Sequence, residues 1–363
     1  MDPRVRKHAK IVVDHCLDVQ AGENVLVEAK PAVEEFVVAL YELLGERNAL
    51  PMRVGDSPRA SQAYLEELDI GTASLKEHRL AAYEAADKVV LVWGMENTRA
   101  SSEMDPEISN AMGEANRAVF EERMDTPWVG TMHPLSGTAQ EAEMSTPAYE
   151  EFVYDAVTKD WEEQRAFQEQ LVELLDPAEE VRIVSGDETD ITMRVDGMDA
   201  GNDYAKRNLP GGEVYTVPIP DSVEGEVRFD VPVVQRGKQL AGVWLRFEEG
   251  EVVEFEAEKN EETLASILDA DEGAKRLGEL GIGMNRDIDQ VTNHMLFDEK
   301  MGDTVHLALG TAIEDVVPEG QPSNESMVHV DMLVDMNEDS YIEFDGEVVQ
   351  RNGTFRFEDG FEE

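Results

Sequence analysis

The chain has 363 residues, of which 80 are acidic and 31 basic, so its formal net charge at pH 7 is −49. This negative field repels phosphate, and we therefore expect no nucleic acid as a partner. Hydrophobic residues still make up 41% of the chain and fall in periodic runs, which excludes a disordered acidic polymer and predicts a folded core.

The first half of the chain alternates predicted helices and strands. Helices are expected at 5–19, 33–44, 61–68, 75–86, 108–122 and 148–175. Strands are expected at 23–29, 50–54, 88–93 and 127–132. The segment 88–93 (KVVLVW) has the apolar composition of a strand buried on both faces. This alternation is typical of a parallel sheet with helices on both faces.

After Pro177 the pattern changes to short alternating strands, at 180–185, 190–195, 227–234, 240–247 and 252–257. One helix is expected at 261–280. Asp345–Gly346 and Asn352–Gly353 predict two hairpin turns. The sequence, whose length favours two domains, therefore predicts an α/β N-terminal domain over 1–184. A strand-rich α+β C-terminal domain that carries the functional site follows over 185–363.

Side chains that bind metals lie in four short segments of the second half, 210–220, 277–285, 298–310 and 327–332. They are Glu213, Glu279, His306, His329 and Asp331. Carboxylates together with imidazoles suit a divalent transition metal better than calcium. Five ligands exceed the needs of one tetrahedral ion, so a two-metal hydrolytic site is the first hypothesis. The alternative for each is a surface acid or a core histidine.

Local patterns add to this hypothesis. Glu279 is expected at the end of the helix 261–280, where a carboxylate is unfavourable unless a cation compensates it. His329 and Asp331 alternate with apolar residues, so on a strand they point to the same side.

These segments resemble those of the aminopeptidase T and aminopeptidase S family of metallo-aminopeptidases. The resemblance begins at the MDPRV opening and includes FVYDAVTKDW (152–161), PGGEVYT, LGELGIG, VHLALG and HVD. It implies a homodimer that hydrolyses the N-terminal peptide bond of peptides with two divalent metal ions (zinc, cobalt or manganese). By motif matching, it assigns metal binding to Glu213, Glu279, His306, His329 and Asp331.

One position departs from the family pattern. Ile313 stands where the family usually has a tyrosine of the metal site, and isoleucine can neither bind a metal nor donate a hydrogen bond. A non-catalytic or weakly active homologue that binds peptide or metal is therefore the alternative. We assign Glu279 as the carboxylate shared between the ions and Glu299 as the candidate general base. Lys300 could stabilise an oxyanion or lie at the surface.

Three further features concern the surroundings of the protein. Cys16 is the only cysteine, so no disulfide can form within the chain, and a reducing cytoplasm fits. No apolar stretch reaches the length of a membrane span. The acidic residues are spread along the whole chain, which indicates adaptation to concentrated salt. The alternative is an acidic surface that binds a basic partner.

The charge predicts that stability depends on salt. At 1 M salt the Debye length is about 3 Å, so repulsion between surface carboxylates is screened. We expect the thermal unfolding midpoint to rise by about 5 °C or more between 0.1 M and 3 M KCl. Calorimetry, with a protein of near-zero net charge as a reference, measures this. A midpoint that rises no more than that of the reference would contradict the expectation.

Overall fold

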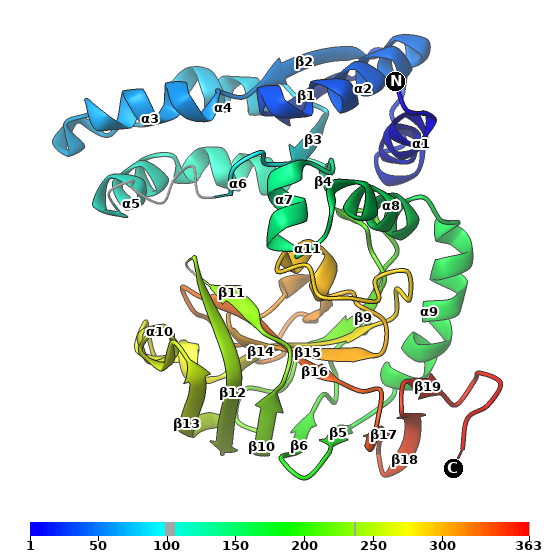
Figure 1. Ribbon diagram of the computed structural model, residues 1–363. Helices are drawn as coiled ribbons and strands as arrows, with labels where there is room; N and C mark the ends of the chain where they lie inside the picture. Colours follow the sequence, from blue (N-terminus) through cyan, green and yellow to red (C-terminus); the bar gives the residue numbers. More distant parts are fainter. Residues whose placement is uncertain (99–105, 236, 363) are drawn as a thin grey trace. The chain divides into compact units, whose positions relative to one another are not determined.

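The computed structural model describes residues 1–98, 106–235 and 237–362 of the chain (Figure 1). It forms two compact units, one of Met1–Lys159 with Ala205–Gly211 and the other of Asp160–Tyr204 with Gly212–Glu363. The chain therefore changes unit at residue 160, and not at residue 185 as expected from the sequence. The cause is that helix 161–175 packs on strands of the second unit, while strand 208–209 joins the sheet of the first.

A five-stranded parallel sheet in the order β2-β1-β3-β4-β8 forms the centre of the first unit. Its strands are β1 (Asn24–Ala29), β2 (Leu50–Val54), β3 (Lys88–Trp93), β4 (Trp128–Met132) and β8 (Asn208–Leu209). Its helices include α1 (Pro3–Ile11), α2 (Glu34–Arg47), α3 (Pro58–Glu66), α4 (Glu77–Glu84), α5 (Pro106–Ala115), α6 (Arg117–Asp125), α7 (Ser136–Glu141) and α8 (Thr146–Val157). This confirms the predicted parallel α/β fold.

Apolar side chains from strands and helices pack together in this unit. Tyr83 of α4 and Val119 of α6 form a buried cluster with Leu26 of β1 and with Val89 and Leu91 of β3. The helix α2 contacts β1 and β2, and α1 packs against α2. The nearly continuous burial of β3 is what the run KVVLVW predicts.

Two long helices predicted from the sequence are interrupted. The segment 108–122 divides between α5 and α6, and 148–175 divides into α8 and α9 (Trp161–Leu175). Asp160 starts α9, because its side chain accepts hydrogen bonds from the backbone N–H groups of Glu162 (3.0 Å) and Glu163 (3.2 Å). Apolar spacing continues across this break, so periodicity alone does not show it.

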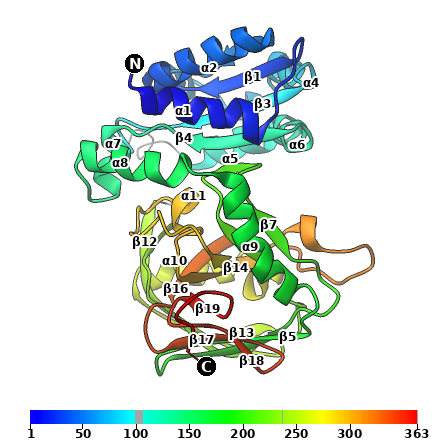
Figure 2. The ribbon, with the colours of Figure 1, turned by 90° about the vertical axis from the view of Figure 1, so that its right-hand side faces the viewer.

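The second unit contains two antiparallel sheets (Figure 2). The larger has nine strands, which are β5 (Glu180–Ser185), β6 (Thr189–Arg194), β10 (Glu224–Phe229), β11 (Val233–Gln235), β12 (Lys238–Glu248), β13 (Glu251–Lys259), β17 (Ser340–Phe344), β18 (Glu347–Arg351) and β19 (Thr354–Phe355). The smaller has the order β16-β15-β14-β9-β7. Its strands are β7 (Gly201–Asp203), β9 (Glu213–Thr216), β14 (Leu277–Gly283), β15 (Thr304–Gly310) and β16 (His329–Asp335).

Helices pack beside these sheets. The helix α9 runs next to β7 (Figure 2) and also contacts β9. The short helices α10 (Glu261–Leu268) and α11 (Met295–Asp298) complete the unit. Both predicted hairpin turns are present, with Asp345–Gly346 and Asn352–Gly353 in the left-handed conformation that they require. Within the described ranges, every helix is too short or too polar to cross a bilayer.

The helix predicted over 261–280 is wrong beyond its first two turns. Helix α10 ends at Leu268, and the residues that follow Lys275 enter the strand β14. Glycines at 278, 281 and 283 disfavour a helix. They suit a sheet in which other atoms lie close to the strand backbone. An ideal Cβ added at Gly278, for example, would lie only 2.3 Å from the carbonyl oxygen of Gly310. Glu279 therefore lies on a strand, and the argument from a helix end does not apply.

A buried histidine joins three elements of the first unit. His8 in α1 is 0% exposed, and its Nε2 lies 2.7 Å from the hydroxyl oxygen of Thr131 in β4. The Thr131 hydroxyl donates to the carbonyl oxygen of Leu209 in β8 at 2.8 Å. Since a hydroxyl has a single proton to donate, His8 is the donor in the first bond. Burial lowers the pKa of His8 from 6.5 to about 3, so the folded chain keeps this imidazole neutral.

This arrangement predicts a loss of stability in acid. Below about pH 6.5 the unfolded chain takes up a proton on His8 that the folded chain accepts only near pH 3, so acidification lowers the free energy of unfolding. In the variant H8Q this contribution is absent, and we expect its free energy of unfolding to fall less steeply between pH 6.5 and 4.5. Urea unfolding at constant high salt measures both slopes, and equal slopes would show that His8 does not contribute.

Candidate metal centre

The five predicted metal ligands lie on the smaller sheet of the second unit. Directly paired residues of antiparallel strands point to the same face, as do alternate residues of one strand. The register pairs Glu279 with Ala308 and Ala308 with Asp331, and it pairs Gly310 with His329. It also pairs Gly281 with His306 of β15 and Gly283 with Glu213 of β9. One face of the sheet therefore carries Glu213, Glu279, His306, His329 and Asp331.

A glycine makes room for the central imidazole. An ideal Cβ at Gly281 would lie 2.0 Å from Cε1 and 2.2 Å from Nε2 of His306, so the ring lies directly over this residue. The imidazole is 1% exposed. The absence of a side chain at position 281 therefore sets where His306 points.

Glu279 contacts both histidines. Its Oε1 lies 3.5 Å from Nε2 of His306, and its Oε2 lies 3.2 Å from Nε2 of His329. The same nitrogen of His329 is 3.2 Å from Oδ1 of Asp331, as predicted for an i, i+2 pair on one strand face. Nε2 of His306 also lies 3.7 Å from Oε2 of Glu213. The carboxylate of Glu279 thus lies between two groups of possible ligands.

Charge and burial shift the pKa values of these residues strongly. Burial disfavours protonation of both imidazoles, but hydrogen bonds to carboxylates and the surrounding negative charge outweigh it. The pKa of His306 rises to about 9 and that of His329 to about 12. Burial favours protonation of Glu279, but the two histidines outweigh it and lower the pKa of this carboxyl to about 2. Burial raises the pKa of Glu213 to about 8, against the charge of Lys300.

The site fits a divalent metal ion by its donor atoms. Glu279, His306 and Asp331 are buried and each offers a ligand atom within 4.8 Å of the others. Within the described part of the chain, Oε2 of Glu213 and Nδ1 of His306 are buried without a hydrogen-bond partner. A buried polar atom without a partner is costly unless another group satisfies it. Imidazole nitrogens and carboxylate oxygens are suitable ligands for zinc and related ions.

A buried ammonium lies beside Glu213. Lys300 is 0% exposed, and its Nζ lies 2.9 Å from Oε1 of Glu213 and 3.6 Å from Oδ2 of Asp203. It also donates to Oε1 of Glu299, the candidate general base, whose pKa is raised because burial outweighs the lysine charge. Lys300 is therefore not a surface lysine. Its contacts are with carboxylates, which does not support the predicted role at an oxyanion.

Asp203 and Gln168 are parts of this site that the sequence did not indicate. Asp203 of β7 pairs with Glu213 across the sheet and so shares its face. The side chain of Gln168 in α9 is buried and donates to the backbone carbonyl of Glu213 at 2.9 Å. Both contacts depend on how distant segments pair and pack, and no local motif marks them.

Ile313 lies in an apolar environment. It packs against a small buried cluster formed by Met198, Val217, Ala312 and Val316. Tyr215, which shares the sheet face of Glu213, packs against the same cluster, and its ring lies over Gly201. Burial raises the pKa of Tyr215 well above its usual value, so its hydroxyl stays protonated.

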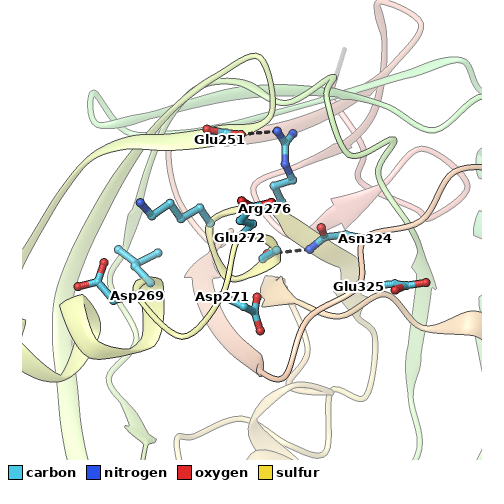
Figure 3. Close-up of a pocket in the computed structure, with 10 residues that line it drawn as sticks. Glu251, Asp269, Asp271, Glu272, Arg276, Asn324 and Glu325 are labelled. Carbon is cyan, nitrogen blue, oxygen red and sulfur yellow. Dashed lines mark hydrogen bonds and ion pairs between the residues drawn. The ribbon is translucent and has the colours of Figure 1, made fainter.

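A cavity of about 760 Å³ lies elsewhere in the second unit and has an acidic lining (Figure 3). None of the five candidate ligands lines it. In its wall, Asn324 donates to the carbonyl oxygens of Gly273 (2.8 Å) and Gly310 (2.7 Å), and Asp271 accepts from the backbone N–H of Met327 at 2.7 Å. These contacts hold the segment that leads into β16 and thereby support the position of His329.

Comparison with known proteins defines the family. The family model of the thermophilic metalloproteases (M29) matches residues 1–355, which is nearly the whole chain. The protein therefore belongs to the thermophilic metalloprotease (M29) family.

Individual relatives agree with this assignment. The chain is 41% identical over 142 residues to aminopeptidase T of Thermus aquaticus and 36% identical over 170 residues to aminopeptidase 2 of Geobacillus stearothermophilus. These matches cover 36% and 42% of this chain, and the chain spans only 35% and 40% of the length of the two relatives.

Solved structures extend the similarity to the whole chain. Wild-type AmpT from Thermus thermophilus superposes with a TM-score of 0.85 at 25% identity, over 98% of this chain and 99% of that one. A 2,5-dihydroxypyridine dioxygenase from Pseudomonas putida KT2440 has a TM-score of 0.64 at 16% identity, over 99% of both chains, which shows the fold alone.

The contact between Gly281 and His306 gives a direct test of the site. In the variant G281A the new methyl group would overlap the imidazole, so the ring must leave the position in which its Nε2 faces Glu279 and Glu213. We expect zinc affinity to fall at least about tenfold, with a loss of about 1–3 kcal/mol in stability from overpacking. Isothermal titration calorimetry measures the affinity. G45A is the control, because a Cβ at this position in α2 meets nothing within 4 Å. Unchanged affinity in G281A would contradict the assigned position of His306.

Proposed function

We propose that the protein is a metallo-aminopeptidase that hydrolyses the N-terminal peptide bond of peptides. The observation that carries this proposal is the buried group of Glu279, His306 and Asp331 on one face of the sheet. Membership of a metalloprotease family and similarity to proteins named aminopeptidase support it. Two divalent ions, zinc, cobalt or manganese, would be held by these residues together with Glu213 and His329.

When bound, such ions activate a water molecule and polarise the carbonyl of the bond to be cleaved. Glu279 is suited to be the shared ligand, because its two oxygens point to different histidines. Glu299 would accept a proton from the attacking water, since burial raises the pKa of this carboxyl and makes its carboxylate a stronger base. Lys300 holds one of its oxygens and so limits how it can rotate.

The acidic character of the site suits a substrate with a free α-amino group. Five carboxylates lie in the region, so a free amine can bind to one of them or to a metal ion, whereas an acylated nitrogen offers neither a positive charge nor a basic lone pair. Capture of this group would restrict cleavage to the first residue. We further propose a cytoplasmic, salt-adapted homodimer, in agreement with the single buried Cys16 and the net charge of −49.

The second candidate function is a homologue that binds peptide or metal without turnover. It is favoured by Ile313, whose surroundings are apolar and which supplies no polar group to the site. The third is an acidic protein that binds a basic partner. This hypothesis predicts that chelation of metal does not change the properties of the protein and that high salt abolishes its interaction with the basic partner.

Hydrolysis of amino-acid p-nitroanilides in high salt distinguishes these functions. We expect turnover that requires added zinc, cobalt or manganese, and no turnover of N-acetylated substrates. The variants E279Q and D331N should lower kcat/KM by about a hundredfold or more, because each removes a charged ligand. E272Q is the control, since Glu272 lines the separate cavity. Metal binding without turnover of any substrate would favour the non-catalytic homologue.

A further inference from the structure

Lys300 is the one cation among the described site residues that is not itself a candidate ligand. Its side chain is completely buried, which is rare for lysine unless it is paired. Its three partners come from different parts of the chain, namely Asp203 in β7, Glu213 in β9 and the adjacent Glu299. The ammonium thus joins two neighbouring strands to the segment that follows α11.

Contacts at both ends fix the orientation of Glu213. The ammonium of Lys300 binds Oε1 at 2.9 Å, and the amide of Gln168 donates to the backbone carbonyl at 2.9 Å. The other carboxylate oxygen, Oε2, remains directed toward His306 at 3.7 Å and has no hydrogen-bond partner among the described residues. One oxygen is therefore used for positioning and the other is offered to the site.

The formal charges allow such a cation within a metal site. Metal ligands must be deprotonated. With every carboxyl ionised and both imidazoles neutral, Asp203, Glu213, Glu279, Glu299 and Asp331 supply five negative charges and Lys300 one positive charge, which leaves −4. Two divalent ions carry +4 and would balance this charge. The site can therefore hold Lys300 and two divalent ions together without an excess of positive charge.

We propose that Lys300 is a positioning residue, which orients Glu213 toward the metal site and holds Glu299, the proposed general base, at one of its two oxygens. The proposal deepens the proposed function and rests on it for the role of Glu299. The role of Lys300 toward Glu213 is independent of turnover and can be measured by metal binding alone.

The sign of the change in metal affinity tests this role. Removal of a positive charge close to bound cations should strengthen their binding if Lys300 acts only through its charge. If Lys300 acts by positioning, the variant K300M should bind zinc at least about tenfold more weakly, because Glu213 loses its orientation. The variant K300R keeps the charge but has a different shape and should fall between K300M and the wild type. K275M is the matched control, since Lys275 lines the separate cavity.

Isothermal titration calorimetry with zinc gives the affinity and the number of ions bound, and p-nitroanilide hydrolysis gives kcat and KM. We expect K300M to lower kcat with little change in KM. Zinc affinity in K300M equal to or tighter than that of the wild type would overturn the proposal. A wild type that binds zinc but hydrolyses nothing would overturn the proposed function, whereas weaker zinc binding by K300M would still support the positioning of Glu213.

A second variant covers the case in which K300M does not fold. The double variant K300M/E299Q removes one positive and one negative charge, so the formal charge of the site stays at −4. It also replaces the carboxylate of Glu299, which would be left without its ammonium partner in K300M, by a neutral amide. It should still bind zinc at least about tenfold more weakly. Wild-type affinity in this variant would show that only the balance of charge matters.

Discussion

The burial of several carboxylates on one face of a β-sheet is the constraint on which the rest of this structure depends. Glu213, Glu279 and Asp331 are each less than a tenth exposed. Glu279 and Asp331 offer ligand atoms within 4.8 Å of each other and of His306, and Glu213 lies 3.7 Å from the same imidazole. A buried charge costs several kcal/mol unless it is paired, and a chain with a net charge of −49 has few cations to spare. The imidazoles of His306 and His329 and the ammonium of Lys300 supply part of the compensation. Divalent ions would complete it, which is why we interpret the region as a metal centre and not as a chance group of acids.

The sheet meets this constraint through its register and its glycines. Four strands that are far apart in the sequence bring their ligands to the same face, because paired and alternate positions coincide there. Gly281 lies beneath the ring of His306 and Gly201 beneath that of Tyr215, so both rings can lie flat on the sheet. Around the site, Gln168 holds the backbone of Glu213, and the segment before β16 is held by Asp271 and Asn324. Residues that are not themselves candidate ligands thus hold the segments that carry the ligands.

Local sequence patterns predicted those structural features that depend on residues close together in the sequence. The alternation around His329 and Asp331 correctly placed both on one strand face, and the apolar run of β3 correctly indicated a buried parallel strand. Patterns that extend across a break were misleading, as at Asp160 and in the segment of Glu279, where apolar spacing continues while the backbone changes conformation. The partners of Lys300 were beyond prediction, because they depend on the pairing of β7 with β9 and on where the segment after α11 packs.

The measurement that tests this account most directly is anomalous X-ray scattering from crystals grown in high salt with zinc, recorded on both sides of the zinc absorption edge. The account predicts anomalous peaks within bonding distance of Glu279, His306 and Asp331, with Glu213 and His329 completing the ligands, and no comparable peak in the acidic cavity beside Asp271. Peaks confined to that cavity, or a sheet face that stays free of metal while its carboxylates point apart, would contradict it.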